Sequence, residues 1–198
     1  MALLEQIHFK VKLNKVLPGT CWYRVFFYIT YCVTINCMIS SSKEIGRYYF
    51  GGYVMERSIF DVVCFVLGKY PELTTMKLQK LMYYIQAWSL AWDDKPMFKE
   101  EFQAWANGPV CHELFKKHKG KFVVTSEDFE AREYDFSETE LDTIEAVLDF
   151  YGDKEPHWLS ELTHSEDPWL LARDGCAPGD SCNKVISKES MQEYYGSL

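Results

Sequence analysis

The four histidines after residue 55 are the first candidates for catalysis or metal binding. His157 and His164 lie seven residues apart in one expected helix, so their side chains fall near one face. His112 and His118 lie in another expected helix. A zinc site needs three or four ligands, and the sequence holds neither an HExxH motif nor a paired Cys/His spacing that would supply them. We therefore predict no metal site and no cofactor.

Cys111, His112 and Glu113 bring a nucleophile, a base and a carboxylate together in the sequence. Successive residues of a helix point about 100° apart, so these side chains cannot face one another as catalytic partners. Phosphate-binding loops of the GxGxxG or GxxxxGK[ST] type are absent from the sequence. The sequence therefore predicts a core cysteine beside a surface histidine, no catalytic residues, and a protein that is not an enzyme.

The chain has seven cysteines, and none of them forms a CxxC pair. An odd number does not favour a complete disulfide framework. Cys176 and Cys182 flank a Pro-Gly loop, and their spacing is not that of a metal site. The simplest interpretation is a reducing compartment, which predicts a cytoplasmic location.

Charge is distributed unevenly along the chain. Residues 1–54 carry a net charge of +4, whereas residues 55–198, with 15 basic and 27 acidic residues, carry −12. An acidic domain repels a phosphate backbone and suits a basic protein partner, so no nucleic acid is expected for residues 55–198. The lysines of 116–121 form the one local basic cluster, which we interpret as a charged helix end, with nucleic-acid binding as the alternative.

Residues 1–54 differ in character from the rest of the chain. Residues 21–39 are nearly all apolar and follow three lysines, which resembles a weak membrane anchor. A start codon assigned too far upstream would also explain this segment, which lacks helical periodicity and turn signals. We favour an irregular or disordered extension, and expect membrane contact only if residues 1–54 are native. The predicted domains are residues 1–54, an N-terminal extension, and residues 55–198, one compact domain.

Residues 55–198 show regular helical spacing of apolar residues. A first helix is expected over 59–67, with Gly68 as its stop. A second helix, capped by a threonine, is expected over 75–92. Its apolar positions form a broad stripe, and Lys80 and Gln86 fall outside that stripe.

The later segments combine strand and helix signals. Residues 98–106 are ambiguous between a strand and a short helix, and Pro109 suits the first position of a helix that reaches about Lys119. Four further helices are expected, over Ser137–Tyr151, Pro156–Thr163, Asp167 to about Gly175 and Ser187 to about Tyr195, and one short strand over 122–125. The predicted fold is mainly α, a compact bundle of about six helices with minor β content.

Five tryptophans lie in residues 55–198, more than a plain core requires. Tryptophan is enriched at binding hot spots. Trp105 lies beside a turn and Trp169 beside a proline, so we expect these two to be exposed. A hydrophobic face of Trp105, Val110 and Trp169, with acidic residues around it, is the predicted contact surface.

An ordered set of short motifs spans about residues 59–195. The motifs are Met76-Lys77-Leu78-Gln79-Lys80-Leu81-Met82-Tyr83-Tyr84, Lys95-Pro96-Met97-Phe98, Ala104-Trp105-Ala106-Asn107-Gly108-Pro109-Val110, Leu162-Thr163-His164, Pro168-Trp169 and Tyr194-Tyr195. In this order and spacing they resemble the Panacea domain family, the SocA-like antitoxin domains, whose members occur in bacteria, plasmids and prophages. Residues 1–54 fall outside the resemblance.

The resemblance implies an antitoxin that neutralises a cognate protein toxin by direct contact, in some relatives as an adaptor that delivers the toxin to a protease. A phage-encoded regulator or interaction protein with another host target is the alternative, and a metal-dependent hydrolase is the least favoured reading. The candidate partner-binding residues are Trp105, Asn107, Val110, His164 and Trp169. The motif residues expected to be structural are Lys77, Leu78, Lys80, Leu81, Tyr84, Gly108, Pro109 and Pro168. We expect the His164 imidazole to bond a backbone carbonyl while the Trp169 indole covers it.

Overall fold

The computed structural model describes residues 49–50, 53–54, 57–130 and 135–198. The chain divides into two compact units, Met1–Met55 and Glu56–Leu198. In the first unit, β1 (Tyr49–Phe50) and β2 (Tyr53–Val54) pair in antiparallel fashion. The expectations for residues 1–48, including the membrane anchor, lie outside the described residues. In the ranges that are described, no helix is long and apolar enough to cross a membrane.

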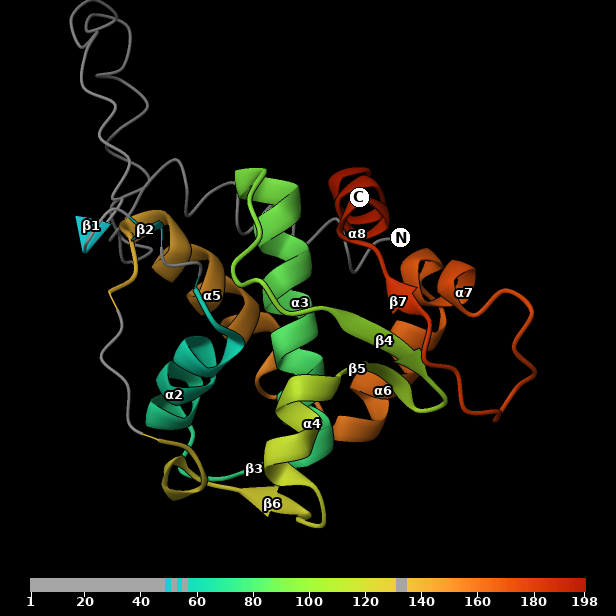
Figure 1. Cartoon of the computed structure of the whole chain (residues 1–198), viewed down its shortest axis with the longest axis horizontal. Helices are drawn as coiled ribbons and strands as arrows, with labels where there is room; N and C mark the ends of the chain where they lie inside the picture. The colour runs from blue at the N-terminus through green and yellow to red at the C-terminus, as the bar shows by residue number, and fades with distance from the viewer. Residues whose placement is uncertain (1–48, 51–52, 55–56, 131–134) are drawn as a thin grey trace, which may run out of the picture. The chain divides into compact units, whose positions relative to one another are not determined.

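The second unit confirms the predicted mainly α fold, with seven α-helices rather than about six in its described part (Figure 1). The helices are α2 (Ile59–Lys69), α3 (Thr75–Asp93), α4 (His112–His118), α5 (Glu138–Tyr151), α6 (Pro156–His164), α7 (Asp167–Ala172) and α8 (Lys188–Gly196), with a 3-10 turn, η2 (Ser126–Asp128). The strands are β3 (Leu73–Thr74), β4 (Phe102–Trp105), β5 (Gly108–Cys111), β6 (Val123–Val124) and β7 (Val185–Ile186). They form an antiparallel pair, β3–β6, and a three-stranded antiparallel sheet in the order β5-β4-β7.

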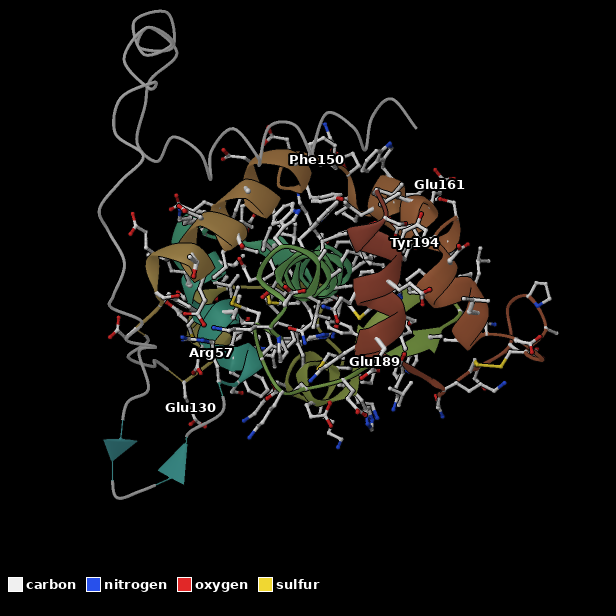
Figure 2. The ribbon with its side chains drawn as sticks, turned by 90° about the horizontal axis from the view of Figure 1, so that it is seen from above. Arg57, Glu130, Phe150, Glu161, Glu189 and Tyr194 are labelled. Carbon is white, nitrogen blue, oxygen red and sulfur yellow. A yellow bond between two sulfur atoms is a disulfide. The ribbon has the colours of Figure 1, made fainter. Side chains whose placement is uncertain are left out.

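Helix α3 is the centre of this unit. Every residue from Leu78 to Leu90 is buried, and α2, α5, α6 and α8 all contact the helix. Figure 2 looks along α3 and shows the other helices arranged around it. A helix that is buried on all sides lies inside a core rather than at the surface.

The polar side chains of α3 bond the loops that surround the helix. Oε1 of Gln86 accepts hydrogen bonds from the Met97 and Phe98 amides at 2.9 and 3.2 Å. Ser89 donates to the Lys95 carbonyl at 2.8 Å. The prediction that Lys80 and Gln86 lie outside the buried face is wrong, because both side chains are buried. Burial is tolerated since each of these polar groups has hydrogen-bond partners.

Two helix start signals in the sequence work as predicted, whereas the stop signal at Gly68 does not. Thr74 caps α3 by accepting a hydrogen bond from the Lys77 amide. Ser137 and Glu140 form the capping box of α5. Gly68 does not end α2, which continues to Lys69. A glycine tolerates helical backbone, and Gly68 does not adopt the positive φ with which a glycine commonly ends a helix.

Residues 98–106 contain strand β4, and Pro109 lies in strand β5 rather than at a helix start. Ala104 faces Pro109 in the hairpin, and the Ala104 amide donates to Lys184 on the opposite side. Antiparallel partners alternate between bonded and non-bonded pairs. Ala104 and Pro109 form a non-bonded pair, so the missing proline N–H costs no hydrogen bond. Helix α4 begins at His112, directly after β5, and not at Pro109.

Candidate functional site

The β4–β5 hairpin is anchored on its inner side by Lys80 of α3. The Lys80 ammonium donates to the carbonyls of Asn107 and Pro109, at 2.7 and 3.2 Å. The side chain is 1% exposed, and no carboxylate partner is found among the described residues. Burial lowers the pKa of Lys80 from 10.5 to about 7. Lys80 therefore supports the hairpin through two hydrogen bonds, as a buried amine that is only partly protonated near neutral pH.

The Gln79 side-chain amide hydrogen-bonds the backbone at the outer edge of β5, as a neighbouring strand would. This amide accepts from the Cys111 N–H at 2.8 Å and donates to the Cys111 carbonyl at 3.2 Å. The same nitrogen lies 2.9 Å from Nε2 of His118. Because the amide nitrogen is a donor, Nε2 of His118 accepts, and burial lowers the pKa of this histidine. Gln79 thus ties α3 to both β5 and α4.

Gly108 is required at the hairpin turn. Its φ is +98°, and a Cβ atom there would lie 2.5 Å from Nζ of Lys80 and 2.7 Å from Oγ1 of Thr163. Positive φ favours glycine, and the close approach leaves no room for another side chain. The turn can therefore lie directly on the lysine only because residue 108 is glycine.

The opposite side of the hairpin is held by α6 and α7. The Trp169 indole donates to the Trp105 carbonyl at 3.0 Å, and Arg173 donates to the Ala104 carbonyl at 2.7 Å. The His164 ring stacks on Trp169 with centroids 4.3 Å apart and hydrogen-bonds the Ala106 backbone. Nε2 of His164 is buried without a partner, so Nδ1 carries the proton that bonds Ala106. This arrangement is the one we expected for His164 and Trp169.

A pocket of about 450 Å³ opens beside the hairpin. Its walls come from the first turns of α3, the hairpin, α4 and the loop before β7 (Figure 1). The lining residues are Thr75, Met76, Gln79, Lys80, Trp105, Ala106, Asn107, Val110, Phe115, His118, Gly179, Ser181, Cys182 and Asn183. Trp105 and Phe115 meet edge to face, with centroids 4.8 Å apart, and form an aromatic wall. The volume lies within the roughly 300–1,000 Å³ of ligand pockets.

The pocket contrasts electrostatically with the domain around it. Its lining contains Lys80 and no aspartate or glutamate, although residues 55–198 carry 27 acidic residues. Five of those acids lie on α5, which Figure 2 places on a different side of α3 from α4. The pocket therefore favours anionic or electron-rich groups within an acidic molecule.

Exposed apolar side chains continue the surface beyond the pocket. Met76 is 38% exposed and Phe122 is 80% exposed. The Thr75 amide donates to the Phe122 carbonyl at 2.9 Å, which places Phe122 next to the pocket wall. Apolar groups left in water beside a concave site are typical of interaction surfaces. We call the pocket together with Met76 and Phe122 the hairpin surface.

The loop before β7 is closed by a disulfide between Cys176 and Cys182. This pairing was not predicted, and it corrects the expectation that the cysteines are all reduced. Arg173 also holds the loop, by donating to the carbonyls of Ala177 and Asp180 at 2.9 and 3.0 Å. The loop is therefore fixed at its base by a side chain as well as by the disulfide.

The structure divides the predicted partner-binding residues into two groups. Trp105, Asn107 and Val110 line the pocket, whereas His164 and Trp169 are absent from its lining. The expectation that Trp169 is exposed is wrong: it is 9% exposed, because its indole is used to hold the hairpin from behind.

Most of the residues that line the pocket were not singled out from the sequence as binding residues. Met76 and Gln79 lie within the quoted motif of α3, and Phe115 and His118 lie three residues apart on α4. That spacing puts Phe115 and His118 on one helix face, a signal that could have indicated a shared site.

A second buried polar cluster surrounds Glu166. Tyr195 and Tyr84 donate to its carboxylate at 2.6 and 3.3 Å, and Tyr84 stacks on Tyr151 with centroids 4.0 Å apart. Burial raises the pKa of Glu166 to about 8, against the lowering effect of the two hydroxyls. The cluster joins α3, α7 and α8 and explains the structural role of Tyr84 and Tyr195.

The described residues include cysteine and histidine side chains, the usual candidates for metal binding and nucleophilic chemistry. No group of three or more metal-ligating side chains occurs among them. Burial raises the pKa of the Cys111 thiol to about 12, so it stays protonated and a poor nucleophile. The best-formed feature is the hairpin surface, which is suited to binding.

Residues 78–170 match the family described as antitoxin SocA-like, Panacea domain. The match includes Lys80, the hairpin, His164 and Trp169, while Tyr194-Tyr195 lies beyond it. The predicted resemblance is confirmed over these residues. No curated protein and no solved structure matches the chain.

Proposed function

We propose that this chain, whose residues 78–170 carry the match to the SocA-like antitoxin Panacea domain, is an antitoxin that neutralises a cognate protein toxin by direct contact. That match is the observation that carries the proposal. An antitoxin of this kind needs a contact surface rather than a reaction centre, and the hairpin surface supplies one.

The hairpin surface has the features of a binding hot spot. Trp105 and Phe115 give a rigid aromatic wall, and Val110 and Met76 extend it. Hot spots concentrate in aromatic residues that lie in concave, well-supported sites. The hairpin is supported from two sides, by Lys80 and by Trp169, so the aromatic wall is held in place before a partner binds.

We also propose a cytoplasmic location, where the toxin would be met. Delivery of the toxin to a protease is a further step that direct contact would permit. A regulator or interaction protein with another host target would use the same surface and remains the alternative proposal.

Co-expression with the neighbouring gene product, as the candidate toxin, tests the proposal. The unchanged chain should restore growth, because it buries the toxin's active surface. Trp105→Ala and Met76→Asp should abolish rescue while leaving the helical circular dichroism spectrum unchanged. The toxin level with and without the host protease, read in the same cells, shows whether the toxin is degraded.

Two matched variants serve as controls. Trp158→Ala removes a half-buried tryptophan of α6, and Leu171→Asp places an acid at an α7 position that is 68% exposed. Neither residue lines the pocket, so both variants should rescue growth. Rescue by folded Trp105→Ala and Met76→Asp would remove the hairpin surface from the proposal. Failure of the unchanged chain with the candidate toxin would contradict the antitoxin assignment for that pair.

A further inference from the structure

We propose that the pocket binds the C-terminal residue of a partner polypeptide, with the terminal carboxylate on Lys80 and the apolar side chain against Trp105 and Phe115. The inference rests on the proposed function, because the polypeptide would belong to the protein that the hairpin surface contacts. It goes further by naming the chemical group that the pocket receives.

The first argument is the state of the Lys80 charge. A buried ammonium is costly unless an opposite charge compensates it. Lys80 has only the two carbonyls of the hairpin as partners, and the pocket lining offers no carboxylate. An ammonium has three N–H donors, of which Lys80 uses two within the described residues. A ligand carboxylate would supply both the missing charge and the third acceptor.

The second argument is the apolar wall that faces the same space. Trp105, Phe115 and Val110 line the cavity together with Lys80. A C-terminal residue carries its carboxylate and its side chain on one Cα atom, so both can enter a single cavity of about 450 Å³. An aspartate or glutamate side chain would meet the lysine but leave the aromatic wall without a partner.

The third argument is the character of the remaining polar groups. Asn107, Ser181 and Asn183 line the pocket with side chains that can donate hydrogen bonds. Thr75 and Met76 bring the first turn of α3 to the same wall, where the helix dipole is positive. These groups suit the second carboxylate oxygen and the last peptide carbonyl of a bound chain.

Titration of Lys80 gives the binding a specific pH dependence. The pKa of Lys80 is about 7, and a bound carboxylate would raise it, so binding takes up a proton and weakens as the pH rises above 7. His118 on α4 lines the same pocket, and His164 on α6 interacts electrostatically with Lys80 and with Arg173, which lies just after α7. Burial lowers the pKa of both histidines, which favours their neutral forms. Glu166 titrates near pH 8 but lies in the tyrosine cluster.

The test uses the full chain and two tripeptides that differ in one group. N-acetyl-Ala-Ala-Phe with a free carboxylate and its C-terminal amide are titrated at pH 6.5 and followed by the tryptophan indole NMR signals. The free acid should bind at least tenfold more tightly than the amide and shift the Trp105 signal. The affinity of the free acid relative to the amide should fall between pH 6.5 and 8.5. Titration of Glu166 would affect both peptides alike, so this ratio is independent of it. Equal affinities, or no shift at Trp105, would overturn the inference.

Two further experiments distinguish a C-terminal carboxylate from a side-chain carboxylate and test whether Lys80 causes the preference for the free acid. N-acetyl-Ala-Glu-Ala amide offers a side-chain carboxylate, and tighter binding of this peptide than of the free acid would contradict a C-terminal ligand. Lys80→Met should remove the preference for acid over amide, whereas Lys77→Met, on the same helix but outside the lining, should keep it. The peptide comparison in the unchanged chain decides the question if Lys80→Met does not fold.

The inference and the proposed function can fail separately. If Trp105→Ala fails to rescue growth but the unchanged chain binds the acid and amide peptides equally, the antitoxin proposal stands and the C-terminal ligand is rejected. A clear acid preference without rescue of growth would keep the pocket assignment and reject the antitoxin role for the toxin tested.

Discussion

At the residue scale, Lys80 and Glu166 are two buried ionisable groups that shape the molecule's response to pH in opposite ways. Each is held by neutral hydrogen-bond partners, backbone carbonyls for Lys80 and tyrosine hydroxyls for Glu166. The folded-state pKa of Lys80 is lowered from 10.5 to about 7, so this group makes stability rise with pH over that range. The folded-state pKa of Glu166 is raised from 4.5 to about 8, which makes stability fall as the pH rises between those values.

Glu166→Gln should therefore flatten the pH dependence of stability in the mildly acidic range. The folded protein keeps the Glu166 proton up to about pH 8, while the unfolded chain releases it near pH 4.5. One such proton changes the free energy of unfolding by up to about 1.4 kcal/mol per pH unit. Urea unfolding at pH 5.5, 6.5 and 7.5 should show this slope in the unchanged chain and lose most of it in Glu166→Gln. Glu161→Gln, at an exposed position of α6, should leave the slope intact, and an equal slope in all three proteins would contradict the assignment.

At the scale of elements, the sequence predicts what depends on neighbours along the chain and misses what depends on tertiary contacts. The Ser137 capping box and the Thr74 cap are local, and both helices begin where expected. Pro109 carries a local signal for a helix start, but the hairpin register leaves its ring in a non-bonded position of β5. Lys80 appears as a surface residue on a helical wheel because the wheel does not show that α3 is covered on every side.

The same limit applies to the candidate site. Trp105 could be chosen from the sequence because an aromatic residue beside a turn indicates a binding surface. Val110 was chosen with it as an apolar residue that follows the same turn. The stacking of Trp169 on His164 was expected, but the hydrogen bond from the Trp169 indole to the Trp105 carbonyl could not be predicted, because the two residues lie 64 positions apart in the chain. The pocket itself arises from α3, α4, the hairpin and the loop before β7, and no sequence pattern shows that these four segments meet.

Gly108→Ala in the β4–β5 hairpin and Gly68→Ala in helix α2 form a matched pair of variants. At Gly108, positive φ and the approach to Lys80 should lower the free energy of unfolding by about 2 kcal/mol or more. At Gly68, which is exposed in α2 with no atom near the added methyl group, alanine should raise it by about 0.5–1 kcal/mol. Chemical denaturation measures both changes. A Gly108→Ala protein as stable as the unchanged chain would show that the hairpin does not rest on Lys80 as described.

At the scale of the whole molecule, the net negative charge of residues 55–198 contrasts with the pocket lining. Residues 55–198 carry −12, yet the pocket lining contains no acid. Long-range charge governs how fast two proteins meet, and close packing governs how long they stay together. We therefore expect the acidic side of the molecule to set the association rate with a basic partner, and the hairpin surface to set the dissociation rate.

Binding kinetics with the purified partner separate these two contributions. Raising the salt concentration from 50 to 500 mM should slow association about tenfold or more, because it screens the attraction of an acidic domain for a basic partner. The triple variant Asp142→Asn, Asp149→Asn, Asp153→Asn removes three charges on and just after α5 and should slow association at low salt without changing dissociation. Trp105→Ala should do the reverse, since it removes packing and leaves the net charge unchanged. If the triple variant sped up dissociation instead, α5 would be part of the contact itself, and the division between an acidic steering side and an apolar docking side would be wrong.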